Sequence, residues 1–203
     1  MHFFNNQVYH IYNRGNDKQL IFFNEGNYLF FLKKIRNEWL KYCEIICYCL
    51  MPNHFHLMIK PNDEACINLV LNEKETHLQN LSKAIGQTLS SYTKAINNQN
   101  NATGNLFQKK TQGKCLSDFQ ETKNGIRPTD YFLACFHYIH QNPLQAKLVN
   151  DLKDWPYSSY PDYNGYRNGT LCNKELAMEL MNLSLNDLRQ DLILKDKIVA
   201  NLF

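Results

Sequence analysis

The sequence has no CxxC pair, no long apolar run and no internal repeat. Its seven cysteines are scattered along 203 residues, and their odd number and irregular spacing argue against a zinc finger and a secreted disulfide scaffold. A membrane-spanning helix needs about 20 consecutive apolar residues, and no segment approaches that length. The first ten residues, MHFFNNQVYH, lack the basic start and long apolar stretch of a signal peptide. We therefore expect a cytoplasmic protein with reduced thiols and no membrane association.

Acidic side chains are missing from one long stretch of the chain. Residues 76–117 contain five lysines and no aspartate or glutamate, although the net charge of the whole chain is only +3. A solvated basic helix face and a phosphate-binding surface both fit this pattern. The charge distribution alone leaves these two interpretations open.

The composition is that of one folded protein of ordinary size. Hydrophobic residues make up 44% of the chain and aromatic residues 13%, which is enough to build a core. Turn residues and apolar periodicity divide the chain into strands and helices. We expect strands at 7–14, 44–51, 54–60 and 106–116, and helices at 25–42, 78–97 and 129–141.

This order of elements predicts an α+β fold of the ferredoxin-like type. In the order β-α-β-β-α-β, the strands form one antiparallel sheet with two helices on one face, and the third helix follows near the open face. Asn24 is the expected N-cap of the first helix. Pro143 disfavours helical geometry at Asn142, so we expect the third helix to break or kink there. We expect the chain to divide into a domain at 1–160 and a helical extension at 161–203.

A pair of histidines occupies one face of the strand at 54–60. Alternate residues of a strand point to opposite sides, so His54 and His56 lie together on the face opposite Phe55. Because the apolar face should lie under the helices, the two imidazoles project from the open side and are close enough to share a metal ion. Surface strands also carry histidines that bind nothing, and the HxH spacing alone does not decide between these interpretations.

The first strand adds three further polar or aromatic side chains to the open face. His10, Tyr12 and Arg14 share one side of that strand, and the predicted topology places it beside the strand of the histidine pair. A basic and aromatic surface suits single-stranded nucleic acid, whose bases stack on rings while its phosphates meet cations. The same tyrosines would also serve as ordinary packing residues.

The third helix places a phenol and an amide one turn apart. Tyr138 and Asn142 are four residues apart and so lie on one helical face. A phenol beside a divalent cation is a possible nucleophile. Two imidazoles and the Asn142 carbonyl oxygen would leave coordination positions for water and phosphate, which suits Mg²⁺ or Mn²⁺ better than a structural zinc site. Most of the 12 tyrosines must be structural, so a structural Tyr138 is the competing interpretation.

Five segments together resemble a known family. The chain is similar to the single-strand HUH transposases with one catalytic tyrosine, and most closely to the REP-associated tyrosine transposase branch. The HxH and YIHxNP segments in this order are specific, whereas no single segment would be. The segments are YHIYNRGNDKQLIF (9–22), YCLMPNHFHLMI (48–59), GNLFQKKTQGKCL (104–116), YIHQNPLQAKLV (138–149) and WPYSSY (155–160).

The resemblance implies a set of roles for the candidate residues. His54 and His56 would hold the catalytic divalent metal, Tyr138 would be the nucleophile, and Asn142 would be the third metal ligand. Many insertion-sequence relatives have glutamine where this chain has the shorter Asn142. The implied reaction is attack on single-stranded DNA that forms a 5′-phosphotyrosine intermediate and is later reversed to rejoin strands. The expected substrates are single-stranded or hairpin DNA.

Phosphate contacts and the alternative functions complete the predictions. Arg14, Lys109 and Lys110 are our candidates for contact with DNA phosphates, together with the surface that contains His10 and Tyr12. A catalytically silent nucleic-acid-binding protein derived from a transposase is one alternative, and a hydrolase that uses water is another. The sequence does not distinguish a monomer from a homodimer.

Overall fold

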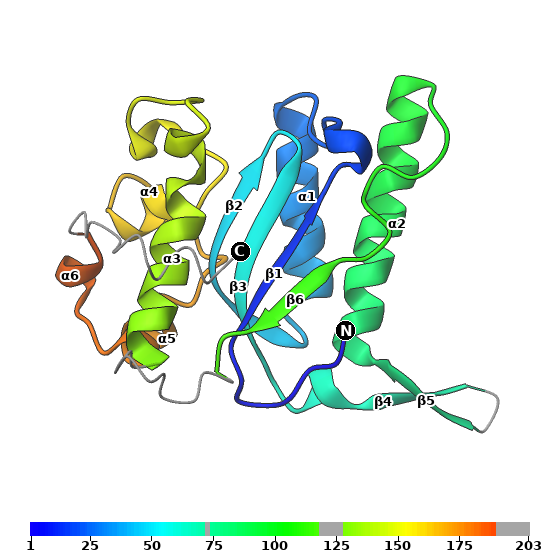
Figure 1. Ribbon diagram of the computed structural model, residues 1–203, viewed down its shortest axis with the longest axis horizontal. Helices are drawn as coiled ribbons and strands as arrows, with labels where there is room; N and C mark the ends of the chain where they lie inside the picture. Colours follow the sequence, from blue (N-terminus) through cyan, green and yellow to red (C-terminus); the bar gives the residue numbers. More distant parts are fainter. Residues whose placement is uncertain (72–73, 118–127, 190–203) are drawn as a thin grey trace.

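The computed structural model describes residues 1–71, 74–117 and 128–189 (Figure 1). Three short 3-10 helices, at Asn16–Lys18, Glu64–Cys66 and Leu152–Asp154, connect the main elements. The strands are β1 (Tyr9–Arg14), β2 (Cys43–Met51), β3 (His54–Pro61), β4 (Asn68–Leu71), β5 (Lys74–Gln79) and β6 (Gln112–Cys115). The helices are α1 (Glu25–Glu38), α2 (Asn80–Asn100), α3 (Pro128–Gln145), α4 (Tyr160–Tyr163), α5 (Lys174–Met181) and α6 (Leu185–Arg189).

Four strands form the central sheet in the order β2-β3-β1-β6. Each neighbouring pair is antiparallel. With α1 between β1 and β2 and α2 between β3 and β6, the chain follows the β-α-β-β-α-β order. The predicted ferredoxin-like α+β fold is therefore confirmed.

Side-chain alternation in β3 divides the core into two parts. Phe55, Leu57 and Ile59 pack with buried residues of α1 and α2 on one face of the sheet. Met58 points to the other face and packs with buried residues of α3. The sequence predicted that this second face is open. Over β2 and β3 this prediction is wrong, because α3 covers them (Figure 1).

Helix α1 begins where the sequence predicts. The Asn24 side chain accepts a hydrogen bond from the backbone N–H of Asn27 at 3.1 Å, which satisfies one of the donors left at a helix N-terminus. The helix ends at Glu38 rather than at residue 42. The buried Trp39 ring packs in the core, and its carbonyl oxygen accepts from the Cys43 N–H at 3.0 Å as β2 begins.

Of the break or kink predicted for α3 at Asn142, the break is wrong, because the helix continues through Pro143 to Gln145. Proline has no N–H, so the Ile139 carbonyl loses its usual helical partner. The side-chain nitrogen of Asn142 lies 3.5 Å from that carbonyl oxygen and replaces part of the missing contact. Beyond the proline, the Ala146 N–H still donates to the Asn142 carbonyl at 2.9 Å.

A second sheet of two strands was not predicted. β4 and β5 form an antiparallel hairpin between the strand predicted at 54–60 and the helix predicted at 78–97, where we expected no element. The hairpin extends away from the rest of the molecule (Figure 1). Leu78, the first residue of the helix predicted at 78–97, lies in β5 and is exposed. The buried Gln79 side chain ties the hairpin to the N-terminal segment through two hydrogen bonds with the Phe3 backbone.

The described residues after 160 include segments that pack on the β2 edge and on α3. The Asn173 N–H donates to the Ile45 carbonyl at 2.8 Å, and Ala177 and Met181 of α5 are buried beside α3. Ser184 and Asp187 exchange backbone-to-side-chain hydrogen bonds, which form a capping box at the start of α6. The division at residue 160 stays a prediction, and residues 190–203 of the predicted extension lie outside the described residues. None of the described helices is long and apolar enough to span a bilayer.

Candidate active site

Strand pairing brings the predicted residues of β1 and β3 together. β1 runs antiparallel to β3, with Arg14 opposite His54 and Tyr12 opposite His56. The His54 and His56 rings are nearly perpendicular, with centroids 5.0 Å apart, and the His10 ring stacks on His56 at the same separation. The predicted shared face of the two strands is therefore present.

Helix α3 places Tyr138 against this histidine group. The Tyr138 ring meets His56 edge-on with centroids 5.5 Å apart, and its centroid is 6.2 Å from that of His10. Asn142 lies one turn further along the helix and makes polar contacts with both His54 and Tyr138. Three elements that are distant in sequence thus supply one compact group of side chains.

The surroundings of the histidine pair favour neutral imidazoles. Burial lowers the pKa of His54, against a smaller opposing effect from its contact with Asn142. Burial lowers the pKa of His56 further, to well below its usual range, and the neighbouring His10 and His54 rings add to the effect. A neutral imidazole keeps a lone pair on one ring nitrogen, which is the form that binds a metal.

In both rings the Nδ1 atom already has a polar partner. His54 Nδ1 lies 2.6 Å from the side-chain oxygen of Asn53, and His56 Nδ1 lies 2.9 Å from His10 Nε2. The Nε2 atoms are consequently the nitrogens that each ring can offer to a cation. This arrangement, in which a ligand's second nitrogen is bound by a neighbour, is common around protein metal sites.

Asn142 is oriented by the helix to which it belongs. Its side-chain nitrogen donates to the Tyr138 carbonyl at 2.8 Å, so a cation would be bound by its Oδ1 atom. No group of three or more His, Cys, Asp and Glu side chains in the described ranges could hold a metal. A metal at this site would therefore be held by two imidazoles and one amide oxygen, and these donors fit a divalent cation that keeps several waters.

The phenol of Tyr138 is protonated at neutral pH. Burial raises its pKa to about 12, although the contact with Asn142 acts in the opposite direction. The ring is only half-buried, so a substrate can reach this part of the site. An attack by this oxygen would require the loss of its proton.

The predicted phosphate-binding residues lie at the end of β1 where Arg14 pairs with His54. The Gln108 N–H donates to the Arg14 carbonyl at 2.8 Å, so the segment of Lys109 and Lys110 runs beside the end of that strand. Both lysines are exposed, whereas Arg14 is half-buried. Their contact with DNA stays a prediction.

Three other residues near the site differ from the sequence interpretation or extend it. His10 is fully buried, so its ring has no exposed surface with which to contact DNA in this structure. Asn53 was not singled out, although its place directly before His54 could have suggested a polar partner. His140 binds the Ser159 hydroxyl through Nε2 at 2.7 Å, so its ring has a structural partner outside the site.

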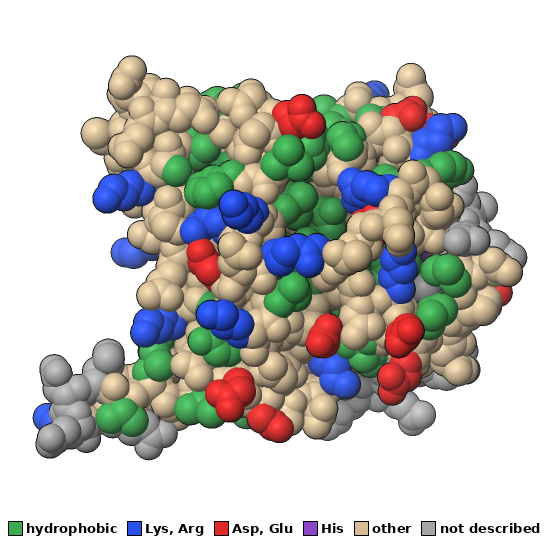
Figure 2. All heavy atoms as spheres, turned by 180° about the vertical axis from the view of Figure 1, so that it is seen from behind, with side chains coloured by type: hydrophobic (Ala, Val, Ile, Leu, Met, Phe, Trp, Pro, Cys, Tyr) green, Lys and Arg blue, Asp and Glu red, His purple; other side chains and the backbone are tan. Residues whose placement is uncertain are grey.

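Two lysines of the acid-free stretch lie away from the histidine–tyrosine site. Figure 2 shows Lys and Arg side chains spread over the side opposite to the view of Figure 1. Lys83 and Lys94 of α2 line a groove there with Lys34 of α1. Because α1 and α2 cover the sheet face opposite Tyr138, these lysines do not belong to the histidine–tyrosine site.

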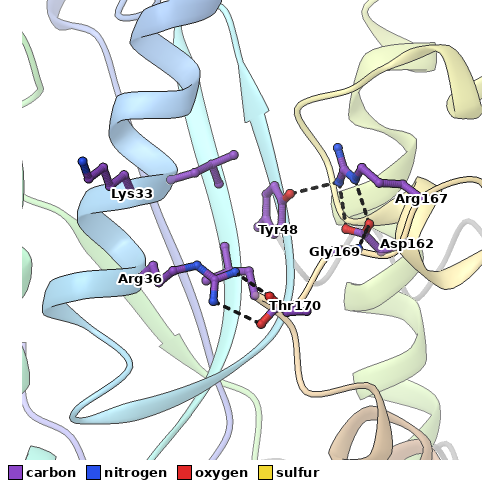
Figure 3. Close-up of a pocket in the computed structure, with 9 residues that line it drawn as sticks. Lys33, Arg36, Tyr48, Asp162, Arg167, Gly169 and Thr170 are labelled. Atoms are coloured by element: carbon purple, nitrogen blue, oxygen red, sulfur yellow. Dashed lines mark hydrogen bonds and ion pairs between the residues drawn. The ribbon is translucent and has the colours of Figure 1, made fainter.

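A separate hollow lies beside the β2 edge (Figure 3). It has a volume of about 350 Å³, and Arg36, Tyr48, Arg167 and Thr170 are among its lining residues. Its arginines are already engaged, since Arg36 donates to the Thr170 hydroxyl at 3.2 Å and Arg167 to the Tyr48 hydroxyl at 3.1 Å. The hollow shares no lining residue with the histidine–tyrosine site.

Comparison with known proteins agrees with the motifs. A Haemophilus influenzae protein provisionally named a REP-associated tyrosine transposase is 23% identical over 137 residues, which cover 64% of this chain and 69% of that protein. A solved structure of a REP-associated tyrosine transposase bound to a REP hairpin matches with a TM-score of 0.57 and 14% identity, over 85% of this chain and 92% of that one. The chain resembles REP-associated tyrosine transposases.

The structural comparison shows a shared fold and does not show the chemistry of this chain. At 14% identity, the match to the hairpin-bound REP-associated tyrosine transposase shows a shared fold. No family model matches the chain. The predicted resemblance is confirmed, while the chemistry must be argued from the site itself.

Proposed function

We propose that the protein cuts single-stranded DNA by attack of Tyr138 on a phosphodiester and later rejoins the strands. The observation that carries this proposal is the position of the Tyr138 ring, which lies edge-on to His56 with Asn142 one turn away. A non-catalytic binding module would need none of these residues at this spacing. The similar protein of known structure is bound to a hairpin, so hairpins with single-stranded flanks are the substrates that we favour.

The reaction exchanges one phosphate ester for another. The Tyr138 oxygen forms a bond to phosphorus, the bond from phosphorus to the 3′ oxygen breaks, and the phenolic proton is balanced by the proton gained by the released 3′-hydroxyl. The product is a 5′-phosphotyrosine link whose ester bond is conserved. A 3′-hydroxyl from the same or another strand can then attack the link and restore the phenol.

The chain would hold a divalent metal through His54 Nε2, His56 Nε2 and Asn142 Oδ1. Mg²⁺ or Mn²⁺ bound there would polarise the phosphate oxygens and favour loss of the phenolic proton. Asn53 and His10 hold the two rings through their Nδ1 atoms, and Arg14, Lys109 and Lys110 would meet the phosphates that flank the cut.

The test is the covalent adduct. Parent protein and the Tyr138→Phe variant are incubated with Mn²⁺ and single-stranded DNA labelled 3′ to the expected cut, and the products are separated by denaturing electrophoresis. We expect a labelled protein band with the parent and none with Tyr138→Phe. Peptide mapping of the adduct should identify Tyr138.

A matched control is Tyr131→Phe, because this phenol lies on the same helix but was given no role in the reaction. It should retain the adduct. Cutting without an adduct in the parent would indicate a hydrolase that uses water. Binding without any cutting would indicate a silent relative. Full adduct formation by Tyr138→Phe would overturn the mechanism.

A further inference from the structure

The two histidines of the proposed metal site have different partners. The side-chain oxygen of Asn53 can only accept a hydrogen bond, so the proton of the neutral His54 ring must lie on Nδ1, 2.6 Å away. His54 Nε2 then carries the lone pair. At this ring the Asn53 partner favours the Nδ1–H tautomer.

At His56 the partner is a second imidazole, and the hydrogen bond has two possible directions. If His10 Nε2–H donates, the proton of the neutral His56 ring lies on Nε2 and blocks ligation there. If His56 Nδ1–H donates to His10 Nε2, then His56 Nε2 carries the lone pair and the proton of His10 lies on its own Nδ1. Only the second arrangement is compatible with a metal on His56.

The position of His10 suits it to this task. Its ring stacks on His56 at an interplanar angle of 22°, and the two nitrogens are 2.9 Å apart. Both residues are held in paired strands, with Tyr9 opposite Ile59 and Ile11 opposite Leu57 on either side of His10. Since His10 is fully buried, solvent cannot replace it as the partner of His56.

We propose that His10 is a positioning residue that accepts the proton of His56 Nδ1 and thereby presents His56 Nε2 to the metal. This inference rests on the proposed metal site. It gives a role to His10, which is buried and so does not contact DNA directly. The class of ligand concerned is a divalent cation, and the effect of His10 on it is exerted entirely through His56.

The first test reads the tautomer without metal or substrate. Nitrogen-15 chemical shifts of the histidine rings in metal-free protein distinguish the Nδ1–H from the Nε2–H form. We expect His56 to be Nδ1–H in the parent protein and in His10→Gln, whose amide oxygen can accept the same hydrogen bond. In His10→Phe, which keeps a ring but offers no acceptor, we expect the Nε2–H form to gain population.

The second test measures Mn²⁺ binding by electron paramagnetic resonance of the free ion. Loss of such an outer partner costs about 10- to 100-fold in metal affinity, so we expect a weakening of this size in His10→Phe and recovery of most of it in His10→Gln. His77→Phe is the matched control, because His77 is exposed on β5, and it should bind Mn²⁺ as the parent does. Thermal unfolding of each variant checks that the fold is intact.

The outcomes separate this inference from the proposed function. An Nε2–H tautomer of His56 in the parent protein, or parent-like Mn²⁺ affinity in a folded His10→Phe variant, would overturn the role of His10. Absence of Mn²⁺ binding by the parent would instead overturn the proposed metal site, while the tautomer measurement would still decide what His10 does to His56.

Discussion

Asn142 shows how one side chain can serve the helix and the site together. Its nitrogen donates to the Tyr138 carbonyl at 2.8 Å and approaches the carbonyl that Pro143 leaves without a helical partner. Because the nitrogen makes this bond, the oxygen of the same amide would be the atom that binds a metal. An amide can donate through its nitrogen and accept or ligate through its oxygen, whereas a carboxylate can only accept.

This division predicts different results for two substitutions at Asn142. Asn142→Ala removes both ends, so we expect weaker Mn²⁺ binding and a loss of about 1 kcal/mol of unfolding free energy, the usual contribution of one hydrogen bond. Asn142→Asp loses the donor but keeps an oxygen ligand, so it should lose similar stability while retaining Mn²⁺ affinity. Urea unfolding and metal titration measure the two effects. Equal metal affinities for the alanine variant and the parent would contradict ligation by this side chain.

Individual site residues could be predicted to the extent that local geometry fixes them. The period of a strand sufficed to place His54 beside His56, and the period of a helix to place Tyr138 beside Asn142. The sequence predicted that β1 and β3 are neighbours but not their register. The contact between the His10 and His56 rings, 46 residues apart in the chain, therefore could not be predicted. Burial of His10 likewise follows from α3 lying over the sheet, which the expectation of an open face did not include.

At the level of elements, the sequence predicted most of the fold because its apolar periods are regular. The hairpin of β2 and β3 and the N-cap of α1 were found at or near their predicted positions. The hairpin of β4 and β5 was missed because its exposed Val70 and Leu78 are not part of an apolar face that packs on the core. The course of α3 through Pro143 was missed because a side chain, rather than the backbone, compensates for the proline.

A cluster of polar contacts attaches the chain after α4 to the β2 edge. Asp162 is 5% exposed and accepts from Arg167 Nε at 2.7 Å, from Arg167 Nη2 at 2.8 Å and from the Gly169 N–H at 2.8 Å. The same guanidinium reaches the Tyr48 hydroxyl of β2 (Figure 3). The pair thus connects the segment that follows α4 with the central sheet.

Removal of one member of this pair should destabilise the fold. Arg167→Ala leaves the Asp162 carboxylate buried without its main partner, and we expect a loss of about 2 kcal/mol in the unfolding free energy measured in urea. In the double variant Asp162→Asn, Arg167→Met the buried charge is absent, so part of the stability should return. A single variant within about 0.5 kcal/mol of the parent, the range of ordinary surface substitutions, would show that the contact is not needed.

On the scale of the whole molecule, the lysines of residues 76–117 lie in separate places. Lys109 and Lys110 lie beside the end of β1 that contains Arg14, next to the histidine pair. Lys83 and Lys94 lie on α2, beyond the core that fills the opposite face of the sheet. A short single strand positioned for attack by Tyr138 can therefore meet the first pair of lysines without reaching the second.

The salt dependence of binding tests this separation. Each phosphate contact with single-stranded DNA contributes about 0.7 to the slope of log affinity against log salt, because bound counterions are released. We expect the double variant Lys109→Ala, Lys110→Ala to lower the slope for a short single strand by up to about 1.4. The matched double variant Lys83→Ala, Lys94→Ala removes the same charge and should leave the slope close to that of the parent. Equal losses in the two variants would mean that net charge, rather than position, governs binding, and a loss confined to the α2 variant would place the single strand on the face opposite Tyr138.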